Sequence, residues 1–138
     1  MSISLSPRAG ALILTFGVSF GSAVAGIASA QTPWVAPEAE KARKNPLASD
    51  SKAIEQGEKV AKTNCVSCHG AKGKGDGAAA AALNPRPADW TSQKVQSESD
   101  GEIFWKISNG RGAMPPWKHL AENDRWALIR YIRSLGSK

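Results

Sequence analysis

The clearest pattern in this chain is a helical spacing of apolar positions that leads into its two cysteines. Between residues 51 and 64, Ile54, Gly57 and Ala61 share one face of a helix, and acids and bases recur four residues apart on the rest of it. Ser51 precedes this stretch as a suitable N-cap. Gly57 costs helix stability of about 1 kcal/mol relative to alanine, so we expect another helix to cross closely there.

Two more helices are predicted towards the C-terminus. Ser99 and Glu102 form a capping box, so a helix begins near Asp100 and ends at Asn109-Gly110. A final helix spans about residues 122–135, where apolar residues recur at i, i+3, i+4 and i+7. Strand patterns are weak throughout. The sequence therefore predicts an all-α fold of three main helices plus loops. The apolar faces of the two C-terminal helices comprise Ile103, Phe104, Ile107, Leu128, Tyr131, Ile132 and Leu135.

Glycines and prolines mark the loops between these helices. Residues 70–77 are dense in glycine but lack the preceding strand and the Lys-Ser or Lys-Thr pair of a phosphate-binding loop, so we expect a tight turn. Residues 78–83 are expected to form a short helix that the prolines at 85 and 87 stop. Pro115 and Pro116 forbid a helix over residues 111–117.

The chain has 138 residues, and its first thirty are typical of an export signal. Arg8 precedes an uncharged stretch, and Ala28-Ser29-Ala30 is a small-x-small sequence of the kind that signal peptidase cleaves. We therefore expect residues 1–30 to be removed and the protein to be periplasmic. An uncleaved membrane anchor is the alternative, because the apolar run is long.

Residues 31–50 contain three prolines and balanced charges, which predicts an extended or partly disordered lead-in. Glu38 to Lys44 are able to form a turn or two of helix, and Trp34 is available to dock on the domain or on a partner. The remaining residues, 51–138, form one small domain.

The motif Cys65-Val66-Ser67-Cys68-His69 contains both cysteines of the chain. Two thiols three positions apart on a helical turn can each add to a vinyl group of a haem, and the histidine after them can bind the iron. The alternatives are a dithiol redox pair, a zinc site and a local disulfide. The strand-helix-strand context of the first is missing, and zinc would need a second pair of well-spaced ligands, whereas His69 directly follows Cys68 and only His119 remains. We therefore predict one covalent haem c, linked to Cys65 and Cys68 and ligated by His69.

A second iron ligand is expected from Met114. It is the only methionine besides Met1, and the prolines after it favour an extended conformation. His119 is its only competitor. A thioether stabilises ferrous iron relative to a second imidazole, which suits an electron carrier.

Together, the haem motif, Met114-Pro115 and the amphipathic last helix make residues 51–138 resemble the class I c-type cytochromes. The resemblance implies that the first and last helices cross at a glycine against an aromatic residue, here Gly57 against Tyr131, although Ala61 stands where the family has a second aromatic. It also implies a proline whose carbonyl accepts a hydrogen bond from the iron-binding histidine. Pro85 and Pro87 are both candidates, and we favour Pro87.

The sequence thus predicts a periplasmic carrier of single electrons rather than an enzyme, since no acid, base and nucleophile cluster around a pocket. The alternatives are a haem subunit held by a dehydrogenase or oxidase, and a ligand-binding or peroxidatic haem protein. No nucleic acid or small-molecule substrate is expected. Residues 51–138 carry 14 Lys plus Arg against 9 Asp plus Glu, so we expect redox partners with acidic docking surfaces.

Overall fold

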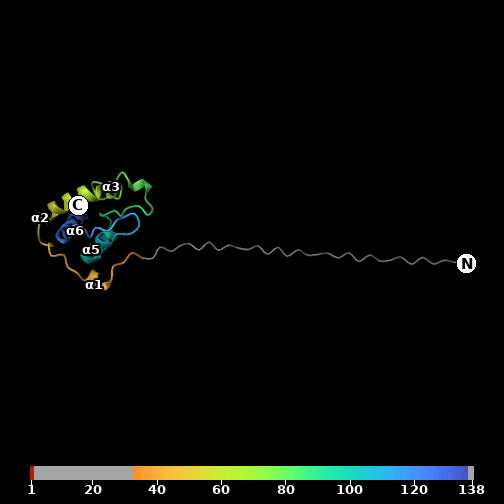
Figure 1. Ribbon diagram of the computed structural model, residues 1–138, viewed down its shortest axis with the longest axis horizontal. Helices are drawn as coiled ribbons and strands as arrows, with labels where there is room; N and C mark the ends of the chain where they lie inside the picture. Colours follow the sequence, from red (N-terminus) through yellow and green to blue (C-terminus); the bar gives the residue numbers. More distant parts are fainter. Residues whose placement is uncertain (2–32, 137–138) are drawn as a thin grey trace. The chain divides into compact units, whose positions relative to one another are not determined.

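The computed structural model describes Met1 and residues 33–136, so the predicted export signal lies outside the described residues (Figure 1). Residues 33–136 form helices and loops without a β-strand, apart from one isolated bridge between Arg111 and Met114. The predicted all-α fold is confirmed. No helix in this part of the chain has both the length and the apolar character needed to cross a membrane.

Helices α2 (Lys52–Asn64) and α6 (Glu122–Gly136) cross at Gly57. A Cβ atom on Gly57 would overlap the backbone of Ala127, so only glycine lets the two helices approach this closely. The close crossing predicted from Gly57 is confirmed. The atoms nearest to a Cβ atom on Gly57 belong to the backbone of Ala127 and Leu128.

Helix α5 (Asp100–Asn109) begins and ends as predicted. The Ser99 hydroxyl accepts the Glu102 amide at 3.1 Å, and Gly110 ends the helix with a positive φ. The apolar face of α5 is buried against α6, where the Phe104 and Trp126 rings stack with centroids 3.9 Å apart. This junction forms one part of the core.

Three short elements complete the domain: α3 (Val66–His69), the 3₁₀ turn η1 (Ala80–Ala82) and α4 (Gln93–Gln96). The short helix predicted over residues 78–83 is a 3₁₀ turn of residues 80–82 only, and α4 was not predicted. Ser92 caps α4 by accepting the Val95 amide at 3.4 Å. A single turn with one buried apolar residue is too short to show a helical period.

Residues 33–50, here called the N-terminal strap, pack against α5 and α6. The strap contains α1 (Glu38–Lys41), and Asn45 in it is only 6% exposed because its amide donates to the Trp126 carbonyl at 3.1 Å. A side chain at Gly101 of α5 would overlap the strap's backbone at Glu40. Helix α1 is the turn of helix considered for residues 38–44, and the strap, which the sequence predicted to be extended or partly disordered, makes these contacts with the domain. Backbone contacts and one buried amide hold the strap, and neither leaves a hydrophobic period in the sequence.

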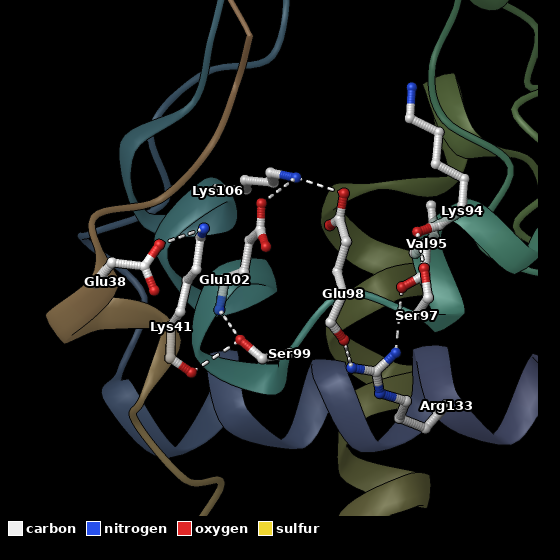
Figure 2. Close-up of polar contacts among 10 residues, drawn as sticks. All are labelled: Glu38, Lys41, Lys94, Val95, Ser97, Glu98, Ser99, Glu102, Lys106 and Arg133. Atoms are coloured by element: carbon white, nitrogen blue, oxygen red, sulfur yellow. Dashed lines mark hydrogen bonds and ion pairs between the residues drawn. The ribbon is translucent and has the colours of Figure 1, made fainter.

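Polar contacts join the strap to α5 and the end of α4 to α6 (Figure 2). The Ser99 hydroxyl donates to the Lys41 carbonyl at 2.9 Å, and Lys106 pairs with Glu102 at 3.0 Å. Arg133 of α6 binds the backbone carbonyls at the end of α4 (Figure 2). Arg133 also pairs with Asp100 of α5 at 2.8 Å. These side chains connect α4, α5, α6 and the strap.

Candidate haem site

The cysteines and the histidine of the motif lie on one turn of helix. Helix α2 ends just before Cys65, whose amide donates to the Ala61 carbonyl at 2.8 Å. The Cys65 carbonyl then accepts the amides of Cys68 at 3.1 Å and His69 at 2.9 Å. Both thiols are free and half-buried. The turn therefore presents two sulfur atoms and an imidazole together.

The state of the Cys65 thiol argues against a dithiol redox site. Burial, and next the neighbouring Cys68, raise its pKa to about 11. A redox-active dithiol needs a thiolate with a lowered pKa, and this environment has the opposite effect. No group of three or more His, Cys, Asp or Glu able to hold a metal occurs in the described residues, which also speaks against a zinc site.

His69 is oriented by a backbone carbonyl. Its Nδ1 lies 3.1 Å from the carbonyl oxygen of Ala88, and its ring stacks on Trp90 with centroids 4.4 Å apart. Such a bond fixes the tautomer in which Nδ1 carries the proton, so Nε2 keeps its lone pair for a metal. Burial lowers the His69 pKa, while the Ala88 carbonyl opposes the shift. Burial thus favours the neutral ring and the hydrogen bond to Ala88 orients it, and iron binding through Nε2 needs both.

The preference for Pro87 as the hydrogen-bond acceptor is therefore corrected to Ala88, one residue later. The Pro87 carbonyl instead faces Gly75, where a Cβ atom would overlap it. Ala88 acts through its backbone, so no side chain in the sequence identifies it. Trp90, which is 7% exposed and supports the His69 ring, was also missed. Its only signal was its place shortly after the two prolines.

The glycine-rich loop closes over the haem motif rather than around a phosphate. The Gly75 amide donates to the His69 carbonyl at 2.8 Å, and the Gly77 amide donates to the Cys68 carbonyl at 3.1 Å. Gly73 has a φ of 69° and lies against the Trp90 ring, where a Cβ atom would clash. The tight turn therefore binds the backbone carbonyls of Cys68 and His69 and places the Trp90 ring next to the His69 ring.

Met114 lies in a short loop that its own backbone closes. Arg111 and Met114 exchange two backbone hydrogen bonds, of 2.8 and 3.0 Å, and Gly110 packs beneath them with a φ of 63°. The Trp117 amide returns the chain to α5 by donating to the Ile107 carbonyl at 3.0 Å. The Met114 side chain is half-buried. The irregular course predicted for residues 111–117 is confirmed.

The donor set fits a covalently held haem. Cys65 and Met114, 49 positions apart in sequence, pack against the same buried apolar cluster. The competing ligand, His119, is exposed, and its ring contacts that of Trp117 with centroids 5.3 Å apart. Two thiols, an imidazole with an available Nε2 and one thioether are the groups that a His/Met-ligated haem c requires.

Comparisons with known proteins agree with this site. Residues 52–132 match the family model described as cytochrome C oxidase, cbb3-type, subunit III. A solved chain of the reducing HAO-like protein complex of Kuenenia stuttgartiensis is 29% identical, with a TM-score of 0.55. That match covers 62% of this chain and 44% of the other, so the chain spans less than half of that relative. No curated protein matched.

Proposed function

Since the chain belongs to the c-type cytochrome family represented by that model, and its domain is one for electron transfer, we propose that it is an exported monohaem carrier of single electrons between redox proteins. Cys65 and Cys68 hold the haem covalently, and His69 and Met114 bind its iron. With both axial positions filled by protein, the site has no place for a substrate, so the protein is not an enzyme.

The bond between His69 and Ala88 is the observation that best supports this proposal. A haem c supplies a one-electron iron couple, and the chain's own residues set its environment. The Ala88 carbonyl holds the His69 ring, the Trp90 ring supports it, and the loop of residues 110–117 presents Met114. None of these groups is placed to transfer a proton to a substrate.

The test is to produce the protein in a host that attaches haem c and to measure its intact mass and its pyridine haemochrome spectrum. We expect the mass of one haem added to the chain and the α-band of a haem with two thioether links. Single Cys65→Ala and Cys68→Ala variants should each shift that band towards one link. A wild-type protein without covalent haem would refute the proposal.

A permanently bound haem subunit is the second candidate, because the solved relative comes from a protein complex. The segment considered as its docking arm is the N-terminal strap, and this segment packs on its own domain. Trp34 is half-buried, with the Lys106 ammonium 5.7 Å from its ring. We therefore favour the free carrier. Native mass measurement on material from the source cell should give a monomer, whereas a stable complex would favour the subunit.

We further propose that the partners present acidic surfaces. Ion pairs neutralise much of the charge on α2, where Lys62 pairs with Glu58 at 2.9 Å. The ion pairs within residues 33–136 involve no cation of the loops after His69 and around Met114. The exposed cations of these loops, which are outside those ion pairs, are Lys72, Lys74, Arg86, Arg111 and Lys118, and Lys74 donates to the Thr91 hydroxyl at 3.0 Å.

Electron exchange with an acidic redox protein should therefore slow steeply as salt increases, because unpaired surface charges are screened. Exchange with a basic redox protein should become faster. Second-order rates across a salt series measure both. A rate with the acidic partner that is flat or rises with salt would reject steering by these cations.

Export and signal removal remain part of the proposal. The mature protein should begin at Gln31, lack residues 1–30 and be found in the periplasmic fraction when the cells are fractionated. N-terminal sequencing of the purified cytochrome checks this. An intact N-terminus in the membrane fraction would instead indicate the anchored form.

A further inference from the structure

Arg43 of the strap contacts both helices that flank the Met114 loop, α5 before it and α6 after it. Residues 110–121 begin where α5 ends and finish where α6 starts. The Arg43 guanidinium lies 4.4 Å from the ring centroid of Phe104 on α5 and 5.2 Å from that of Trp126 on α6. Its Nη2 also pairs with Glu122, the first residue of α6, at 2.6 Å. One side chain therefore contacts both stems of the loop.

A second arginine makes a parallel connection from within the matched domain. Arg125 of α6 lies 4.5 Å from the same Phe104 centroid and donates to the Ser108 hydroxyl on α5. Ser108 directly follows Ile107, whose carbonyl accepts the Trp117 amide and so closes the loop. The loop of Met114 thus depends on the α5–α6 junction, and two arginines hold that junction.

The position of Arg43 in the strap is fixed independently of its guanidinium. Asn45 is buried against α6 through its bond to the Trp126 carbonyl, and the Lys41 carbonyl accepts the Ser99 hydroxyl at the start of α5. Glu40 also pairs with Arg43 at 3.3 Å. The strap therefore holds the Arg43 cation close to the α5–α6 junction. This lowers the entropy lost when Arg43 makes its contacts there.

We propose that Arg43 is a positioning residue for the sixth iron ligand: it restrains the opening of residues 110–121 and thereby keeps Met114 on the iron. This rests on the proposed role of Met114 as a ligand. The strap precedes the 52–132 region that the family model covers, so the restraint is an addition to the family's domain. Without Arg43 the loop keeps its own hydrogen bonds, but α5 and α6 are free to separate at its two ends.

The experiment compares wild-type holoprotein with Arg43→Leu, which keeps an apolar contact but removes the charge. Imidazole binding to the ferric protein requires Met114 to leave and so reports loop opening. We expect its rate to rise about tenfold, the size expected when one half-exposed ion pair and its cation–π contacts are lost together. The Trp117 amide should exchange its hydrogen faster by a similar factor, whereas the Cys65 amide should not.

Two controls separate this role from a general loss of stability. Lys59→Leu removes the cation of the exposed pair with Glu55 on α2. Ala53→Gly weakens a buried position of α2 outside the apolar cluster that contacts Met114. Neither should change the imidazole rate. An unchanged rate in Arg43→Leu, or an equal rise in Ala53→Gly, would overturn the inference.

The methionine charge-transfer band of the ferric protein separates a failure of this inference from a failure of the proposed ligation by Met114, on which the inference rests. If Met114→Ala keeps this band, Met114 is not the ligand and both fail. If Met114→Ala loses the band and Arg43→Leu leaves the imidazole rate unchanged, only the role of Arg43 fails.

Discussion

The loop side and the helical side of this domain are built in different ways. On the loop side, residues 66–92 and 110–121 are shaped by glycines with positive φ and by backbone hydrogen bonds, and their cations are unpaired. On the helical side, α5, α6 and the strap share buried aromatic rings, a buried amide and ion pairs such as that of Lys106 with Glu98 at 2.5 Å.

The difference indicates that the haem and the chain's own side chains stabilise different parts of the domain. The loop side carries the proposed haem ligands but few large apolar side chains of its own, so the haem must supply its core. The helical side is held by the stacked Phe104 and Trp126 rings, the buried Asn45 amide and its ion pairs, and the loops extend from it. Changes on the two sides should therefore have separable effects on the haem spectrum and on stability.

Removing the haem should have the largest effect. The Cys65→Ala/Cys68→Ala double variant cannot hold haem covalently, and so small a domain lacks a sufficient core without it. We expect largely unfolded protein, with loss of the cooperative melt followed by far-ultraviolet circular dichroism. A haem-free variant that stays compact and melts cooperatively would show that the loop side does not need its cofactor.

Breaking the helix crossing should lower stability and leave the ligands in place. The methyl group of Gly57→Ala would overlap the Ala127 backbone, so α2 and α6 must move apart. We expect a net loss of about 2 kcal/mol, because the overpacking exceeds the gain in helix propensity. Guanidinium unfolding measures the loss, and the methionine charge-transfer band should persist. An unchanged midpoint would argue against the close crossing.

Loosening the strap should lower stability by a similar amount. Asn45→Ala leaves the Trp126 carbonyl and the Leu47 amide without their partner, at a cost of about 1–3 kcal/mol. Lys44→Ala, at the exposed neighbouring position, is the matched control and should unfold like the wild type. Equal midpoints for the two variants would mean that the strap is not part of the folded unit.

The sequence was most informative where function restricts side chains. Cys65, Cys68, His69 and Met114 were predicted as haem ligands from residue type and spacing, and α2, α5 and α6 were predicted from their apolar period. The contacts that act through the backbone left no such pattern, which is why Pro87 was preferred to Ala88. The packing of the strap was not predicted for the same reason, since its attachment depends on carbonyl groups, Asn45 and Arg43.

The smallest predicted effect is on the loop side, at Asp89 beside the His69 support. Hydrogen bonds from the Thr91 hydroxyl and amide hold the pKa of Asp89 below its ordinary value of 3.8. Its contribution to stability is therefore complete above that value and is lost as the pH falls through the lowered folded pKa. Asp89→Asn should flatten the acid side of the stability profile slightly, as measured by urea unfolding between pH 3 and 6. A profile identical to wild type would contradict this.

The axial ligation of the iron is the central claim, and the near-infrared spectrum of the ferric protein tests it most directly. We predict a methionine-to-iron charge-transfer band in the wild type that His119→Ala retains and Met114→Ala loses, because Met114 lies in the loop closed on α5 and His119 is exposed. A spectrum without this band in the wild type, or one that changes with His119→Ala and not with Met114→Ala, would contradict the account.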